Sequence, residues 1–201
     1  MIIRERLDRI YAALGETFTQ DHSKFGALVT PQPWGVRVTF DGGLSQAQLL
    51  NAAMQAVFHV AHLRDHLKRW ACEHGCSPDD LETAMASSLA LRVIVDLADR
   101  DKHGGSPRNR GYSGRDPRLT HVARGIRSTG GSALPIVRFA IGPSDVTAPE
   151  SAADAAVVIS GPVFDFAGER IGDLNDLLTE ALRVLEDVLA RWQAQGPSAS
   201  V

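Results

Sequence analysis

The spacing of apolar residues divides the chain into helical and extended segments. From residues 2 to 19, apolar side chains recur at steps of three and four, which predicts an amphipathic helix. The same spacing recurs from about 173 to 193, where Asp173 stands at the start as a predicted N-cap. Between 26 and 40, two short apolar runs flank a turn rich in proline, which predicts two strands.

Two longer helices are predicted in the middle of the chain. Ser45 and Gln48 have the spacing of a capping box, which predicts a helix that ends before Gly75. A Ser-Pro pair at 77–78 begins a second helix, which is expected to continue without a break to a Gly-Gly pair. Because only a short turn separates them, we expect an antiparallel helix hairpin over residues 44–103.

The order of these elements predicts the fold class. Further strands are predicted at 136–141 and 155–166, but strands and helices do not alternate as a parallel sheet requires. We therefore predict one α+β domain over residues 1–201: a helical bundle with a central antiparallel helix hairpin, packed with a small antiparallel sheet. Residues 195–201 are small and polar, and they are predicted to form a disordered tail.

Composition narrows the class of protein. The 201 residues are 44% apolar and include two cysteines, enough for a sizeable core and too few for a disulfide framework. Apolar runs are too short to span a membrane, and the N-terminus lacks the pattern of a secretory signal. These features predict a soluble, cytoplasmic protein.

Charge is distributed unevenly along the chain. Residues 100–127 contain eight Lys or Arg against two acids, so the net charge of -3 combines about six positive charges there with about nine negative charges elsewhere. Glycine and proline are frequent between 104 and 131, which predicts a basic loop. Such a loop, which contains one aromatic residue, Tyr112, could bind the phosphates of RNA or another polyanion, or its arginines could pair with the acidic remainder. The candidate binding residues are Arg108, Arg110, Arg115, Arg118, His121, Arg124 and Arg127.

Each of the two central helices carries a polar stripe at helical spacing. The stripe on the first helix consists of His59, His62, Asp65, His66 and Arg69. The stripe on the second consists of Arg92, Asp96, Asp99 and His103, with Lys102 beside it. Because the second helix is apolar nearly all round, it is expected to be buried, with its stripe facing something polar. Ion pairs are predicted between Arg92 and Asp96 and between Asp99 and His103.

Three interpretations of the stripes remain open. They could form a structural polar network that holds the helices in register. They could form an acid–base site, in which a carboxylate orients His103 and Lys102 holds an anionic substrate. They could also form a metal centre from facing helices. The residues of that alternative are His59, His62, His66, Asp96, Asp99 and His103.

Other familiar chemistries lack support. The cluster Cys72, His74 and Cys76 lacks a fourth zinc ligand and predicts reduced thiols. No glycine-rich nucleotide loop and no Gly-x-Ser-x-Gly motif is present, so no cofactor is predicted.

Two short motifs resemble those of a known group of proteins. The first begins at His62 and reads HLRDHL, and the second begins at Asp96 and reads DLADRDKH. The pair is similar to His-x-x-Asp-Trp-Leu and Asp-Leu-Ala-Asn-x-x-Lys-His in uncharacterised bacterial proteins that resemble the HEPN superfamily. The matched stretch covers about residues 44–104, and it differs from the pattern at His66 and Asp99.

The resemblance implies a function. HEPN proteins are helical bundles of phage-defence, toxin and RNA-processing systems, and their ribonucleases are metal-independent. It implies a catalytic cluster of His62, Asp65, Asp96, Asp99, Lys102 and His103. His103 or His121 would act as general acid or base, and nearby arginines would stabilise the phosphate.

The ribonuclease motif of that superfamily, Arg-x4-6-His, is also present by spacing. Arg69 with His74 and Arg115 with His121 both fit, the latter if Pro117 opens a short helix. The alternatives are a helical-bundle metalloprotein with His and Asp ligands, and a non-catalytic homodimeric interaction protein.

Overall fold

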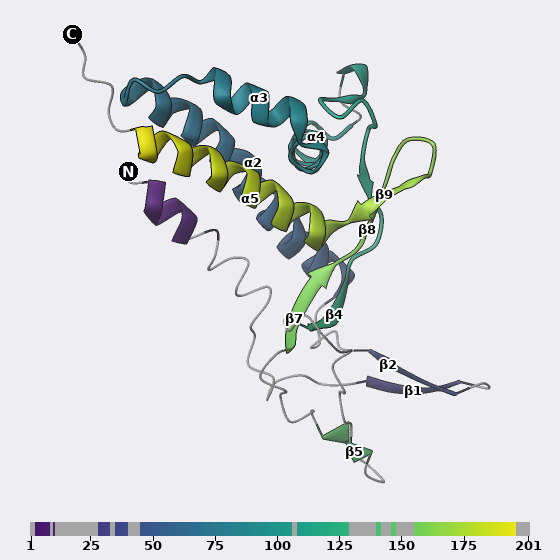
Figure 1. Ribbon diagram of the computed structural model, residues 1–201. Coiled ribbons are helices and arrows are strands. Elements are labelled where there is room, and N and C mark those ends of the chain that lie inside the picture. The colour runs from purple at the N-terminus through teal and green to yellow at the C-terminus, as the bar shows by residue number, and fades with distance from the viewer. Residues whose placement is uncertain are drawn as a thin grey trace.

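The computed structural model confirms the predicted fold class. The residues that it describes are 3–8, 10, 28–32, 35–39, 45–105, 108–128, 140–141, 146–147 and 155–195. Within them, a helical bundle packs against small antiparallel sheets, as Figure 1 shows. None of the described helices is both long and apolar enough to cross a membrane.

Two long helices form the body of the bundle. They are α2, Gln46–Glu73, and α5, Leu174–Gln195, which lie side by side and run toward the same end (Figure 1). Both begin where their predicted caps are. The Ser45 Oγ accepts from the Gln48 N–H at 3.3 Å, and the Gln48 side chain accepts from the Ser45 N–H at 2.8 Å, completing the capping box. The carboxylate of Asp173 accepts from the Asn175 N–H at 3.1 Å at the start of α5.

The second helix of the predicted hairpin is interrupted, which corrects the expectation of one continuous helix. It consists of α3, Asp79–Ser87, and α4, Leu89–His103. Ser88 between them is extended, with ψ 111°, and its side chain accepts from the Leu91 N–H at 3.1 Å. Ser88 therefore ends α3 and caps α4. The two helices differ in direction: in Figure 1, α4 points along the line of sight while α3 crosses the view.

The break between α3 and α4 gives Arg92 a partner other than the predicted one. Its guanidinium donates to the carbonyl oxygens of Met85 and Ala86 at the end of α3, rather than to Asp96. The predicted pair between Arg92 and Asp96 is therefore wrong. A cation at a helix C-terminus satisfies carbonyls that have no partner within the helix.

The core lies between α2, α4 and α5. Val57 and Val60 of α2, Leu91 and Ile94 of α4, and Leu185 of α5 are fully buried. Each such side chain contributes about 1.5–3 kcal/mol to stability relative to an exposed position.

A single tryptophan links the far end of α5 to α3. Trp192 is 1% exposed, and its ring lies 6.0 Å from that of Trp70 in α2. The Trp192 indole N–H donates to the Asp80 carboxylate at 2.8 Å. The buried ring thus keeps a hydrogen-bond partner for its one polar atom.

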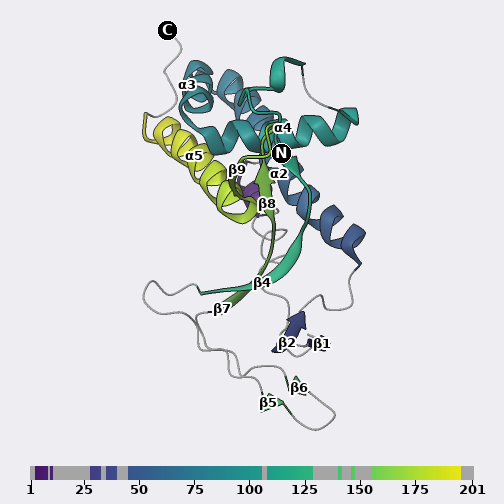
Figure 2. The same ribbon diagram turned by 90° about the vertical axis from the view of Figure 1, so that its right-hand side faces the viewer.

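A three-stranded antiparallel sheet adjoins the start of α5, in the order β3, β8, β9. Its strands are Arg118–Leu119, Pro162–Phe164 and Arg170–Asp173. A second pair joins β4, Ala123–Ser128, to β7, Ala155–Ser160, and Figure 2 shows it extending away from the helices. The predicted strands at 155–166 are therefore confirmed, divided at Gly161.

The remaining strands form two hairpins. They are β1, Leu28–Gln32, with β2, Gly35–Thr39, and β5, Ala140–Ile141, with β6, Val146–Thr147. The first pair confirms the strands predicted between 26 and 40.

Some predictions fall partly outside the described residues. Of the predicted N-terminal helix, residues 3–8 and 10 are helical, and the others are not described. Of the strand predicted at 136–141, only the last two residues are described. The predicted tail lies outside the described residues beyond Gln195, which is still helical.

The predicted basic loop over 104–131 is not wholly a loop, because β3 and β4 lie within it. The short helix that Pro117 could open, a condition for the Arg115–His121 motif, does not form, since Arg118 pairs with Phe164 and Leu119 with Val163 in strand register. Such partners lie more than forty residues away in sequence, so local composition does not reveal them.

Candidate nucleic-acid interface

The residues of the predicted catalytic cluster occupy different environments. Only Asp96 of this set is fully buried, and Asp99 is half-buried. The exposed members are His62, Asp65, Lys102 and His103. Two of the exposed residues have local contacts. The Asp65 carboxylate accepts from its neighbour Arg64 at 2.8 Å, and the His62 ring lies 5.9 Å from that of Phe58.

The metal-centre alternative finds no support in the part of the chain that the structure describes. There, no group of three or more His, Cys, Asp or Glu side chains could hold a metal ion. Cys72 and Cys76 are free thiols, as predicted. The His74 ring stacks on Trp70, with centroids 4.1 Å apart, and its Nδ1 lies 2.9 Å from the Trp70 carbonyl oxygen.

Asp96 anchors the segment that follows α4. Its Oδ1 accepts from the Tyr112 N–H at 2.7 Å and its Oδ2 from the Ser113 N–H at 2.8 Å. Burial raises the pKa of Asp96 above its ordinary value, an effect that the hydrogen bonds from Ser113 and Tyr112 oppose and the nearby Asp99 reinforces. Asp96 of the α4 stripe therefore faces a polar partner, as predicted, and that partner includes two backbone N–H groups.

Gly111 allows this close approach. Its φ is +78°, and a Cβ at this position would lie 2.2 Å from Oδ1 of Asp96. Asn109, Arg110 and Asp116 also have positive φ, between 47° and 63°. The segment 108–116 is thus a series of tight turns with a defined shape.

Buried carboxylates hold the arginines of this segment. Asp116 accepts from the guanidinium groups of Arg100 and, at 3.2 Å, Arg118. Asp165, in the turn between β8 and β9, lies 3.7 Å from Arg115. The carboxylates of Asp116 and Asp165 are each 7% exposed, so these arginines have fixed anchors. The pairing with the acidic remainder, expected as the alternative to phosphate binding, is therefore present for Arg115, whereas Asp116 belongs to the basic segment itself.

Two aromatic rings stand exposed beside these arginines. Tyr112 is 57% exposed and Phe166 is 46% exposed. The guanidinium carbon of Arg110 lies 3.8 Å from the centre of the Phe166 ring, and that of Arg64 lies 5.5 Å from the centre of the Tyr112 ring. The Phe166 N–H donates to the Arg115 carbonyl at 2.9 Å, which joins the β8–β9 turn to the segment after α4.

We call this region the basic aromatic surface. It consists of Arg64, Arg110, Tyr112, Arg115, Arg118 and Phe166. Arg110, Arg115 and Arg118 are among the binding residues predicted from the sequence, and Tyr112 is the aromatic residue of the basic loop. Arg64 and Phe166 were not predicted. The signal for Phe166 was an aromatic residue followed by Ala-Gly within a polar turn.

The other predicted binding residues lie outside the basic aromatic surface as defined above. His121 is exposed, in the segment before β4. Arg108 lies in a short 3-10 turn, and Arg124 and Arg127 lie in β4, opposite Ile159 and Ala156. The side chains of these three arginines lie outside the described part of the structure.

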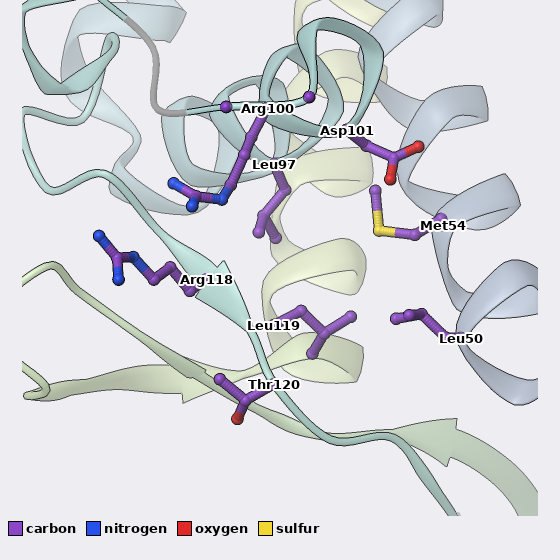
Figure 3. Close-up of a pocket in the computed structure, with 10 residues that line it drawn as sticks. Leu50, Met54, Leu97, Arg100, Asp101, Arg118, Leu119 and Thr120 are labelled. Carbon is purple, nitrogen blue, oxygen red and sulfur yellow. The ribbon is translucent and has the colours of Figure 1, made fainter. Parts of the chain in front are cut away.

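A cavity of about 390 Å³ adjoins the basic aromatic surface (Figure 3). Its walls come from α2, from the end of α4 and from β3. Apolar side chains form one part of the lining: Leu50, Met54, Leu97 and Leu119. Arg100 and Arg118 lie at one side of the cavity, Asp101 lies at the other, and Thr120 lies at the edge.

Comparison with known proteins identifies no relative: no protein family, no curated protein and no solved structure matches the chain. The fold and the surface therefore define the class, an α+β helical-bundle protein with exposed aromatic rings among anchored arginines. The resemblance to HEPN proteins stays a prediction from the two motifs.

A separate cationic cluster, formed by α2 and the N-terminal helical segment, leads to a pH prediction. His66, Arg69 and Arg6 line a smaller cavity of about 150 Å³. Burial, followed by the charges of Arg6, Arg69 and His62, lowers the pKa of His66 below its ordinary value, despite the opposing charge of Asp65. Protonation of His66 is therefore less favourable in the folded chain than in the unfolded chain.

The unfolded chain then binds the proton first as pH falls, so stability is expected to decrease from the ordinary histidine pKa of about 6.5 down to the lowered folded pKa. His66→Gln should reduce this decrease, measured as Tm between pH 7.5 and 5. His121→Gln removes an exposed imidazole outside the cluster and serves as the control. An identical pH dependence of Tm in wild type and His66→Gln would contradict the assignment.

Proposed function

We propose that this protein binds single-stranded RNA in the cytoplasm, through the basic aromatic surface. The observation that carries the proposal is the pair of exposed rings, Tyr112 and Phe166, each with a guanidinium group against it. Unpaired bases stack on exposed aromatic rings, and arginines contribute both stacking and attraction to phosphate. Base pairs within a duplex do not offer their faces in this way, so a single strand fits better.

The buried carboxylates support the same proposal. Arg115 and Arg118 keep 44% and 46% of their side chains exposed while Asp165 and Asp116 fix their positions. A guanidinium has five N–H donors, so one carboxylate partner leaves donors for a phosphate. Prior anchoring lowers the conformational entropy lost when the strand binds.

The proposal is limited to binding. Asp96, which belongs to the predicted catalytic cluster, has both carboxylate oxygens engaged by backbone N–H groups. His103 and His121 remain exposed candidates for a general acid or base. Cleavage as in HEPN ribonucleases is therefore a question for the same experiment, answered by the length of the RNA afterwards.

The test is the binding of a labelled single-stranded RNA of mixed sequence, followed by fluorescence anisotropy at 50 and 200 mM salt. We expect binding that weakens as salt rises, because phosphate contacts release counterions. Phe166→Ala and Tyr112→Ala should each weaken binding roughly 5- to 150-fold, since stacking of one base contributes about 1–3 kcal/mol.

Matched controls lie outside the surface. Leu89→Ala removes another exposed apolar side chain, on α4, and Arg183→Ala removes an exposed arginine of α5. Both should bind RNA as the wild type does. The proposal fails if binding is absent or independent of salt, or if the ring substitutions weaken it no more than the controls do.

A further inference from the structure

The cavity of about 390 Å³ is continuous with the basic aromatic surface through Arg118. This arginine lines the cavity and also shares Asp116 with Arg100. The Asp116 N–H donates to the carbonyl of Arg110, the residue that contacts the Phe166 ring, at 3.0 Å. Hydrogen bonds therefore link the cavity lining to the basic aromatic surface. Arg118 thus belongs both to the cavity lining and to the basic aromatic surface.

The cavity has two chemically different sides with an apolar region between them. In Figure 3, the guanidinium groups of Arg100 and Arg118 lie on one side, and the carboxylate of Asp101 lies on the other. Leu97 and Leu119 lie between them, Met54 lies beside Asp101, and Leu50, at 38% exposure, is on the same lining. A ligand that fits has flat apolar faces, hydrogen-bond donors on one edge and an anionic group at the other end.

The end of α4 leaves room for such a ligand. Gly104, with φ +64°, and Gly105 both line the cavity, and a Cβ at either position would meet nothing within 4 Å. Asp101 lies in the last turn of the same helix, with its side chain exposed. The carboxylate is thus accessible at the edge of an open space.

We propose that the cavity binds a guanine nucleotide, and that it selects guanine in the RNA strand; the second part rests on the proposed function above. A nucleotide has the required flat base and anionic phosphate. Guanine alone presents two adjacent donors on its Watson–Crick edge, N1–H and the N2 amino group, and a carboxylate accepts from both. Adenine and cytosine place an acceptor beside their amino group, and uracil places its N–H between two carbonyls.

Each side of the cavity has a defined part in this recognition. Asp101 accepts from the N1–H and N2 amino groups, Met54 and Leu119 contact the faces of the base, and Arg100 and Arg118 contact the phosphate. Adenine would turn its N1 acceptor toward the carboxylate, leaving two acceptors facing each other.

The first test measures mononucleotides without RNA, by isothermal titration of the full chain with 5′-GMP, 5′-AMP and 5′-IMP. We expect GMP to bind roughly 5- to 150-fold more tightly than AMP, the range typical of a bidentate base contact. IMP retains N1–H but lacks the N2 amino group, so its affinity should fall between the two. Equal affinities for GMP and AMP, or no binding of either, would overturn the inference.

Asp101→Asn provides the decisive variant, because an amide offers one acceptor and one donor where guanine needs two acceptors. It should remove the preference for GMP over AMP while Tm stays near that of the wild type, since the side chain is exposed. Asp187→Asn, an exposed carboxylate of α5, is the matched control and should keep the preference. A preference that persists in Asp101→Asn would contradict the role of Asp101.

The second test separates this inference from the proposed function, using oligouridine with and without one central guanosine. Tighter binding of the guanosine-containing strand, lost in Asp101→Asn, supports both. If both strands bind equally and depend on Phe166, RNA binding stands and base selection fails. If neither strand binds while GMP binds through Asp101, the cavity is a guanine nucleotide site and the proposed RNA function fails.

Discussion

Replacement of Asp96 by alanine is expected to lower the free energy of unfolding by about 2–6 kcal/mol, because each of two backbone donors loses its partner at a cost of about 1–3 kcal/mol. The carboxylate is fully buried and accepts from the backbone N–H groups of Tyr112 and Ser113 at 2.7 and 2.8 Å. Without it, two donors lose their partners and a small cavity opens beside α4. Urea denaturation followed by circular dichroism measures the change.

Two further substitutions show whether the hydrogen bonds cause this loss. Asp96→Asn keeps the shape of the side chain but supplies one acceptor for two donors, so we expect a loss of about 2–3 kcal/mol. Asp65→Ala removes an exposed carboxylate whose partner is its neighbour Arg64, and it should change stability by less than about 1 kcal/mol. A loss below about 1 kcal/mol for Asp96→Ala would show that the two bonds contribute little.

Gly111→Ala is expected to destabilise the protein by at least about 3 kcal/mol, for two separable reasons. A Cβ there would lie 2.2 Å from Oδ1 of Asp96, which forces the carboxylate or the loop to move. The φ of +78° adds a conformational cost of about 1–2 kcal/mol for any residue with a Cβ. The same denaturation experiment measures the sum.

A matched control and a double mutant separate the two costs. Gly114 has a similar φ of +69°, but a Cβ there meets nothing within 4 Å, so Gly114→Ala should show the conformational cost alone. In the Asp96→Ala background, Gly111→Ala should lose its steric part and approach the value for Gly114→Ala. Strict additivity of the Asp96 and Gly111 substitutions would refute the close contact between them.

The parts of the fold that sequence predicted correctly are those with local causes. The starts of α2 and α5 follow from Ser45, Gln48 and Asp173, whose side chains bond to backbone within three residues. The break at Ser88 has an equally local cause, but the apolar spacing continues through it and concealed the second cap. Periodicity detects a buried face and does not detect a change in helix direction.

The parts that sequence did not predict depend on distant partners. β3 exists because Leu119 pairs with Val163, and the turns after α4 exist because Asp96 binds the backbone at 112 and 113. Backbone N–H groups are the same in every residue type, so the sequence of the acceptor does not indicate which donors it will meet. The stripe on α4 therefore predicted a polar partner without identifying it.

The candidate site shows the same division between local and distant causes. The arginines of the segment after α4 were recognisable by composition, as was Tyr112 among them. Phe166 joins them only through the turn between β8 and β9, where its N–H bonds to Arg115. A surface assembled from two segments some fifty residues apart along the chain has no signature in either one.

The bond between Asp96 and the backbone after α4 has a consequence for cooperativity. Surface turns commonly open by themselves, at a small fraction of the free energy of global unfolding. Here, opening the turn at 112–113 would leave a buried carboxylate without its two donors, in the helix that packs against both α2 and α5. Local opening of this turn therefore carries a cost that an ordinary surface turn lacks, so the turn with Tyr112 is expected to stay closed while the bundle is folded.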